Sequence, residues 1–297
     1  MDSIVTKSML NDYMNGLDII YWINLNTSKN RYNNMVKILK QITINNIRIN
    51  AVDGKLDPDN IIYGKINNEP QKHRTKIEYA CLLSHLETIK IFSESDYTTA
   101  LILEDDISLD FVKYWDKSIK TIIDNAPNDW EIIMLNYIID NSNKITQIYT
   151  PNNGDIWGTG SYIINKKTAI KLIKSIYINN KYILDANKTH TADNYLFTSV
   201  LTYVYKYAYF TYPDDNDSTI HSEHINMHIN SKKIIIDIWK KYYIEYISNT
   251  DNNSTTQPYN LQGKNKTYKY KMIIYIGLVV MLIFIYIAYI YKYNLYQ

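Results

Sequence analysis

A short apolar segment that ends in three acids is the feature that most constrains how this chain can fold. Residues 99–103 are uncharged, and Glu104, Asp105 and Asp106 follow them directly. Such a segment is typical of a strand inside a covered sheet, so we expect the acids at the carboxyl end of that strand. Side chains alternate along extended backbone, which places Glu104 and Asp106 on one side and Asp105 on the other.

Two carboxylates at one edge of a sheet repel each other unless a cation lies between them. Oxygen ligands favour Mg²⁺ or Mn²⁺, and such an ion can neutralise a diphosphate leaving group as a Lewis acid and a template. The alternative is a solvated acidic turn, which many protein surfaces carry. The three acids alone do not decide between these interpretations.

Strand and helix patterns alternate along the chain. This alternation predicts an α/β domain with a mainly parallel central sheet, in which sites gather at the carboxyl ends of the strands. The polar segments 55–74 and 140–155 are expected to be loops. Strands are expected at 18–25, 42–52, 99–103, 131–135, 161–164 and 208–212, and helices at 29–41, 77–92, 114–125, 167–176, 193–203 and 234–247.

The C-terminal region contains a different kind of segment. Residues 272–291 carry no charge, and a helix of about 20 apolar residues spans the hydrocarbon core of a membrane. The alternative is a buried core helix. Four lysines lie within 264–271, against Lys292 alone after the segment, and the N-terminus has no signal-peptide pattern. Because positive charge stays cytoplasmic, we expect a single-pass C-terminal anchor with the large domain in the cytosol.

These patterns divide the chain into five parts. The net charge of +2 gives no indication of a nucleic-acid partner. Cys81 is the only cysteine, which excludes an intrachain disulfide and fits a reducing compartment. The parts are an N-terminal extension (1–17), the main domain (18–247), a polar linker (248–270), a transmembrane helix (271–292) and a short tail (293–297).

Seven short motifs occur in a particular order between residues 18 and 222. In that order and spacing, they resemble glycosyltransferase family 25, which includes bacterial lipooligosaccharide glycosyltransferases and procollagen galactosyltransferases. Two positions depart from the family pattern: Ala80 stands where glycine is usual, and Asn194 replaces an acid after Asp193. The motifs are Ile23-Asn-Leu25 with Arg31, Ala51-Val-Asp-Gly54, Glu78-Tyr-Ala-Cys-Leu-Leu-Ser-His85, Leu103-Glu-Asp-Asp106, Gly158-Thr-Gly-Ser-Tyr-Ile163, Thr191-Ala-Asp193 and Asp217-Ser-Thr-Ile220.

The resemblance implies a GT-A-like domain that binds a nucleotide-diphosphate sugar. In such a domain the acidic motif holds Mn²⁺ or Mg²⁺ against the donor diphosphate, so Glu104 and Asp106 are the expected metal ligands. Asp105 is expected to contact the nucleotide sugar or to support the ligands. His221 is a further candidate ligand; the alternative is that His221, His224 and His228 only share one face of a helix.

The other site residues carry alternatives of their own. Arg31 can pair with phosphate or the nucleotide, or be an ordinary surface arginine. Asp53 and Gly54 can contact the nucleoside, or simply shape a turn. Asp193 can deprotonate an acceptor hydroxyl, or cap a helix. His85 is interpreted as a neutral core histidine rather than a catalyst.

The predicted function is transfer of a hexose, galactose or glucose, from a UDP-sugar to a hydroxyl of a glycan or hydroxylated protein. One alternative is a membrane-anchored scaffold that keeps the fold without catalysis. Another is a metal-dependent phosphohydrolase, which needs more converging acids or histidines than the sequence offers. The bias toward Ile, Asn, Lys and Tyr, with the family resemblance, is typical of a large DNA virus, so the membrane would be that of a host cell or virion.

Overall fold

The computed structural model describes residues 6–213 and 225–250. Most of the described residues belong to one compact unit, 4–244. The segment 272–291 and the predicted linker from 251 onward lie outside the described residues. Within the described ranges, no helix combines the length and the apolar character that crossing a membrane requires.

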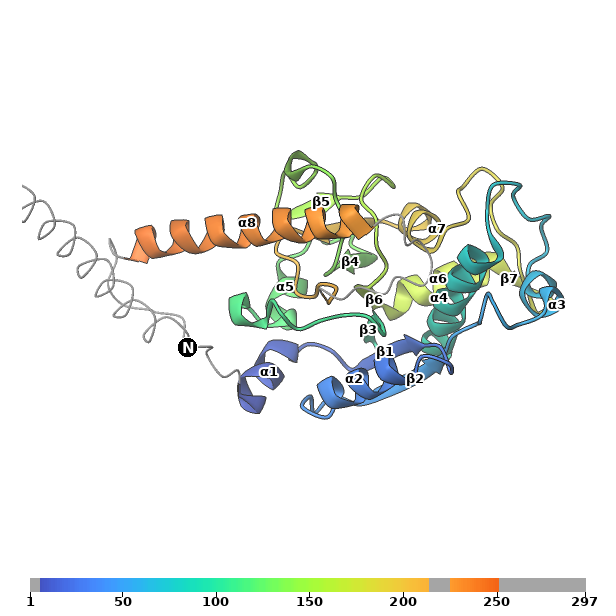
Figure 1. The fold of residues 1–297 in the computed structure, drawn as a ribbon, viewed down its shortest axis with the longest axis horizontal. Helices are drawn as coiled ribbons and strands as arrows, with labels where there is room; N and C mark the ends of the chain where they lie inside the picture. Colours follow the sequence, from blue (N-terminus) through green and yellow to red (C-terminus); the bar gives the residue numbers. More distant parts are fainter. Residues whose placement is uncertain (1–5, 214–224, 251–297) are drawn as a thin grey trace, which may run out of the picture. The chain divides into compact units, whose positions relative to one another are not determined.

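A seven-stranded sheet forms the centre of the unit 4–244 (Figure 1). In order across the sheet, the strands are β2 (Asn46–Asn50), β1 (Ile19–Asn24), β3 (Thr99–Glu104), β6 (Ser161–Asn165), β4 (Ile132–Met134), β9 (Thr202–Tyr205) and β5 (Tyr149–Pro151). Strands β2, β1, β3, β4 and β9 run in one direction, whereas β6 and β5 run in the other. The expected α/β class is confirmed, and the sheet is mainly parallel because five of its seven strands run in one direction.

Helices flank this sheet and connect its strands. They are α1 (Lys7–Met14), α2 (Lys29–Leu39), α3 (Asp59–Ile62), α4 (Lys76–Glu94), α5 (Ile119–Asp124), α6 (Lys166–Ile176), α7 (Ala192–Ser199) and α8 (Ile225–Thr250). Helix α4 packs against β1 and β2 and also contacts α6 and α7. It is therefore enclosed by other elements along much of its length.

Three parallel strands end side by side at one edge of the sheet. Ile23 of β1 pairs with Glu104 of β3, and Asn24 pairs with Asn50 of β2. All six residues of β1 are buried, as are the four central residues of β3. Because both strands are covered on both faces, their polar residues collect where the strands end.

The reversed strand β6 brings a further segment to the same edge. Leu103 pairs with Ser161 in antiparallel register, and the Glu104 N–H donates to the Gly160 carbonyl at 2.9 Å. The first residues of β6 therefore lie beside the last residues of β3. As a result, the loop that precedes β6 enters the edge at which the acids leave the sheet.

Helix α4 begins at a capping box. The Thr75 hydroxyl accepts a hydrogen bond from the Glu78 N–H, and the Glu78 carboxylate accepts one from the Thr75 N–H. These reciprocal bonds satisfy two donors of the first turn and define the start of the helix. Residues with polar side chains, including Ser84 and His85, are buried on this helix.

Several expected elements differ from the structure. The helix expected at 193–203 ends at Ser199, and 202–205 form β9, since the run Thr-Tyr-Val-Tyr favours a strand. The expected strand 208–212 is a buried segment with one isolated bridge at Thr211. Instead, the N–H groups of Tyr209 and Phe210 donate hydrogen bonds to the Leu135 carbonyl. The Tyr209 carbonyl accepts a hydrogen bond from the ring nitrogen of Trp115.

Other elements occur where none was expected, or have different bounds. Helix α1 lies within the predicted N-terminal extension, and Leu10 and Met14 bury against the core. Strand β5 and the hairpin β7 (Tyr177–Ile178) with β8 (Lys181–Tyr182) were not predicted, because such short strands show little periodicity. The helix expected at 114–125 is reduced to α5, and α8 begins nine residues before the expected 234.

Candidate active site

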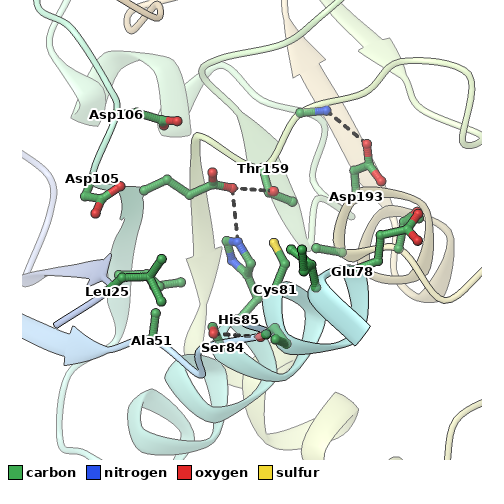
Figure 2. Close-up of a pocket in the computed structure, with 18 of the residues that line it drawn as sticks. Leu25, Ala51, Glu78, Cys81, Ser84, His85, Asp105, Asp106, Thr159 and Asp193 are labelled. Atoms are coloured by element: carbon green, nitrogen blue, oxygen red, sulfur yellow. Dashed lines mark hydrogen bonds and ion pairs between the residues drawn. The ribbon is translucent and has the colours of Figure 1, made fainter. Parts of the chain in front are cut away.

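A pocket of about 660 Å³ opens at the edge where β1 and β3 end (Figure 2). Its wall also includes α4, the loop before β6 and the start of α7. The sequence-predicted residues Arg31, Asp53, Gly54, the three acids and Asp193 all line this pocket. The fold therefore brings together residues that lie far apart in the sequence.

Glu104 is held by a chain of hydrogen bonds. Its Oε1 lies 2.5 Å from the donating Thr159 hydroxyl and 3.2 Å from Nε2 of His85. The other ring nitrogen of His85 lies 3.1 Å from the hydroxyl of Tyr162. Burial alone would raise the pKa of Glu104, but the bonds from His85 and Thr159 lower it below its usual value. Glu104 is thus kept ionised inside the pocket wall.

Asp105 turns toward β1 and α2 rather than standing free. Its Oδ2 accepts a hydrogen bond of 2.6 Å from the Asn24 amide, and its Oδ1 lies 3.0 Å from Nη1 of Arg31. Only 7% of the residue is exposed. Burial raises its pKa even though Asn24 and Arg31 both favour the charged form. These contacts join β3 to β1 and α2.

Asp106 is the least satisfied of the three acids. Its Oδ2 lies 3.2 Å from Nη1 of Arg31, whereas its buried Oδ1 has no hydrogen-bond partner among the described residues. Burial, together with the negative charge of Glu104, raises the pKa of Asp106 to about 7. A buried carboxylate oxygen without a donor is costly unless a cation or donor reaches it.

The acids therefore fit a divalent cation. Glu104 and Asp106 supply hard oxygen atoms on the wall of one pocket, and the buried Oδ1 of Asp106 has no donor that an ion would have to displace. Arg31 already offsets part of the negative charge, because it pairs with Asp105 and Asp106. The guanidinium is therefore part of the pocket wall and contacts two of the acids.

Hydrogen bonds and close packing determine the conformation of the loop that contains Asp53 and Gly54. Asp53 Oδ1 accepts hydrogen bonds from the N–H groups of Lys55 and Leu56, at 2.8 and 3.0 Å. A Cβ on Gly54 would lie 2.5 Å from the Cα of Ile77 in α4. Gly54 is therefore needed for close packing against α4, and the side chain of Asp53 organises the turn that lines the pocket.

Asp193 lies in the first turn of α7 and faces the pocket (Figure 2). Thr191 occupies the N-cap position, so Asp193 does not cap the helix. Its Oδ2 accepts a 3.3 Å hydrogen bond from the Gly158 N–H, and its Oδ1 accepts one from the Asn194 N–H. Gly158 has a φ of +98°, a conformation that glycine adopts readily.

The histidine predictions have different outcomes. His221 and His224 lie outside the described residues, so a metal role for His221 stays a prediction. His228 lies on α8 and lines the pocket. His85 is buried, as expected of a core histidine, but its ring also contacts Glu104. The sequence gave no signal for this contact, because it depends on how α4 packs beside the end of β3.

Three residues that position the acids lie within the quoted motifs, but sequence reasoning gave them no role. They are Asn24, Thr159 and Tyr162, which contact Asp105, Glu104 and His85 respectively. Asn24 is a buried polar residue in an otherwise apolar strand, and that pattern was visible in the sequence. The motif around Thr159 and Tyr162 did not indicate their partners, because these contacts depend on how β6 pairs with β3.

Comparisons with known proteins identify relatives of this chain. A sequence model described as glycosyltransferase family 25 (LPS biosynthesis protein) matches residues 18–186. Procollagen galactosyltransferase 2 of Homo sapiens is 31% identical over 131 residues, which is 40% of this chain and 21% of that protein. The Mus musculus protein of the same name is 32% identical over 130 residues, with the same shares. The chain thus matches about a fifth of the length of these curated relatives.

Among solved structures, HddC from Yersinia pseudotuberculosis aligns with 79% of this chain and 85% of its own, at 13% identity and a TM-score of 0.32. That likeness is too low to bear on the function. The family match is of a different kind, because it spans more than half of the chain and includes the three acids, Arg31 and the loop before β6. This chain belongs to glycosyltransferase family 25.

Proposed function

We propose that the chain transfers a hexose from a UDP-sugar to a hydroxyl group of a glycan or hydroxylated protein. Membership of glycosyltransferase family 25 supports sugar transfer. The name of the relatives, procollagen galactosyltransferase, supports galactose over glucose and a protein acceptor. The observation that carries the proposal is the buried, unpartnered Oδ1 of Asp106, which lines the same pocket as Glu104 and Asp193.

The donor diphosphate is proposed to lie against the acids. Glu104 and Asp106 would hold Mn²⁺ or Mg²⁺, which when bound supplies a Lewis acid for the departing diphosphate. Arg31 lies on the same wall and adds a fixed positive charge beside the phosphate position. The turn of Asp53 and Gly54 lines the part of the pocket next to α2, where we place the nucleoside.

The acceptor is proposed to enter from the side of α7. Asp193 is held by the Gly158 N–H, which orients the carboxylate toward the pocket. As the bond between the sugar carbon and the diphosphate oxygen breaks, UDP leaves with the electron pair. The acceptor oxygen forms the new bond to the sugar carbon, and Asp193 takes the hydroxyl proton. This arrangement is typical of a GT-A-like domain.

The test is sugar transfer by the full chain, followed by mass spectrometry with a panel of UDP- and GDP-sugars. We expect UDP release that requires both an acceptor and Mn²⁺ or Mg²⁺ and that falls at least about 100-fold in Asp106→Asn, since an electrostatic stabiliser contributes this much to catalysis. A scaffold gives no turnover with any donor. A phosphohydrolase releases phosphate without an acceptor, and either result would overturn the proposal.

A membrane anchor at 272–291 remains part of the proposal and rests on the sequence alone. The predicted division into extension, domain, linker, anchor and tail has the same basis. Protease treatment of intact membranes that carry the full chain tests both. A domain in the cytosol is digested without detergent, whereas protection of residues 1–260 would contradict the predicted orientation.

A further inference from the structure

Helix α4 directs a cysteine and a histidine at one of the pocket acids (Figure 2). Cys81 and His85 lie one helical turn apart and so share a face of the helix. One potential ligand atom from each of Cys81, His85 and Glu104 lies within 4.8 Å of the other two. Sulfur, imidazole nitrogen and carboxylate oxygen together form a donor set different from that of the three acids.

The distances in this cluster suit a small tetrahedral ion. Two ligand atoms on one zinc ion lie roughly 3.3–3.6 Å apart when the zinc–nitrogen and zinc–sulfur bonds have their usual lengths. Nε2 of His85 and Oε1 of Glu104 already lie 3.2 Å apart. The thiol of Cys81 would complete the set with a movement of about 1 Å, which a side-chain rotation supplies.

Supporting contacts for such a site are already in place. Metal-bound histidines almost always use their second ring nitrogen in a hydrogen bond that orients the ring. Nδ1 of His85 lies 3.1 Å from the Tyr162 hydroxyl, which leaves Nε2 directed at Glu104. Glu104 is likewise held by the hydroxyl of Thr159. Both non-sulfur ligands are therefore oriented before any ion binds.

None of the roles proposed above involves Cys81. It is a free cysteine on the pocket wall, and its thiol makes no hydrogen bond with any of the described residues. A thiol favours borderline or soft ions such as Zn²⁺ over Mg²⁺ and Mn²⁺. The pocket offers an ion a route to the thiol, because Cys81, His85 and Glu104 all line it.

We propose that Cys81, His85 and Glu104 form a second metal site, which takes Zn²⁺ or Co²⁺ and leaves the fourth ligand position open to the pocket. On binding, the thiol of Cys81 loses its proton to solvent and the sulfur bonds to the ion, so one proton is released per ion at this ligand. His85 binds through Nε2, and its remaining ring proton moves to Nδ1, facing Tyr162.

The two proposed metal sites share Glu104. An ion held by Cys81 and His85 draws this carboxylate toward α4, so the two sites compete for it. Zn²⁺ at the second site withdraws Glu104 from Asp106 and blocks sugar transfer; this consequence rests on the proposed function, whereas zinc binding does not. Zinc is then an inhibitor of an enzyme that Mn²⁺ or Mg²⁺ activates. Cys81 has the strongest influence on this competition, because thiolate favours Zn²⁺ over Mg²⁺ and Mn²⁺ more than imidazole or carboxylate does.

Absorption spectroscopy of the full chain in detergent, titrated with Co²⁺, tests the site without an activity assay. We expect one equivalent of Co²⁺ to produce a thiolate-to-metal charge-transfer band, and Zn²⁺ to displace it. Calorimetry should show that Zn²⁺ affinity falls in Cys81→Ser and His85→Gln by more than the 10–100-fold typical of a lost supporting contact. In Tyr162→Phe, the loss should stay within that 10–100-fold range.

His190→Gln is the matched control. His190 is as buried as His85 and also contacts a tyrosine hydroxyl, that of Tyr79 at 2.9 Å, but it is not part of the cluster. Its replacement should leave the Co²⁺ spectrum and the Zn²⁺ affinity unchanged. Circular dichroism of each variant separates lost binding from lost folding, and Cys81→Ser is the conservative change if His85→Gln fails to fold.

The possible outcomes distinguish the proposed zinc site from the proposed function. The proposal is overturned if folded protein gives no thiolate band, or if Zn²⁺ affinity is the same in Cys81→Ser as in the unaltered chain. Zinc binding without sugar transfer under any condition would leave the site intact and contradict the proposed function instead. If transfer occurs, the concentration of Zn²⁺ that halves it should rise at least about tenfold in Cys81→Ser, measured against that variant's own rate without zinc.

Discussion

Nη1 of Arg31 lies 3.2 Å from Oδ2 of Asp106, so a cation supplied by α2 neutralises an acid that leaves β3. The same guanidinium atom also contacts Asp105 at 3.0 Å. Arg31 therefore stabilises part of the negative charge of the two acids by itself. The stability of the metal-free protein should depend on this arginine.

Replacing Arg31 with methionine should destabilise the metal-free protein. The change leaves two largely buried carboxylates without their cation, and breaking a buried ion pair costs about 3–5 kcal/mol. Arg31 is partly exposed, with 21% of its side chain accessible, so we expect about 1–3 kcal/mol. Urea unfolding in EDTA at neutral pH measures the loss. Arg31→Lys keeps the charge and should lose less; equal losses would show that packing, not charge, is what matters.

The metal-free protein should lose stability as the pH rises from about 4 to about 7. The folded-state pKa of Asp106 is raised to about 7, because burial and Glu104 disfavour the charged form. In this range the folded state therefore binds a proton that the unfolded state has released, and stability falls as pH increases. Melting temperatures in EDTA from pH 5 to 8 should show this decline, and Asp106→Asn should reduce it. The same slope in both proteins would rule out Asp106 as its source.

Gly54→Ala should destabilise the domain by about 1–3 kcal/mol, the usual cost of overpacking. The new Cβ would lie 2.5 Å from the Cα of Ile77, and backbone cannot yield as a flexible side chain does. Gly64→Ala is the control, because no atom lies within 4 Å of a Cβ built there. Chemical denaturation of both variants should give a large difference in midpoint. Equal midpoints would show that the loop of Asp53 and Gly54 moves away from α4 freely.

Asp193→Asn should lower sugar transfer by about 10²–10⁴-fold, the range that a general base contributes. The asparagine carbonyl can still accept the bond from the Gly158 N–H, so the fold should persist. Asp155→Asn makes the same charge change at an exposed position outside the pocket and should keep near-normal rates. Steady-state kinetics with saturating donor distinguish the two. An Asp193→Asn enzyme with an unaltered rate constant would remove Asp193 from the mechanism.

The elements that carry the acids could be predicted because their signals are local. An uncharged run before Glu104 indicates a buried strand, and Thr75 with Glu78 marks the start of α4. The placement of the acids at the carboxyl end of a strand followed directly. Only the family resemblance, and not the periodicity, predicted that the acids share one site with Arg31 and Asp193.

The contacts that tune the acids could not be predicted from the sequence. Thr159 reaches Glu104 across 55 positions of sequence, through the reversed pairing of β6 with β3. Nothing local in 161–165 indicates whether that strand runs parallel or antiparallel to its neighbours. For the same reason His85 was interpreted as a core residue: its burial was foreseeable, and its partner on β3 was not.

Because β6 runs antiparallel to β3, the contacts of the acids depend on the register of this strand pair. A slip of one residue along β3 would turn Tyr162 to the opposite face of the sheet, because side chains alternate with a period of two. His85 would lose its tyrosine and Glu104 its threonine in the same event. An insertion ahead of Gly158 does not by itself shift the register of β6 on β3, so changes of length there should alter the pocket wall at Trp157 rather than the contacts of Glu104.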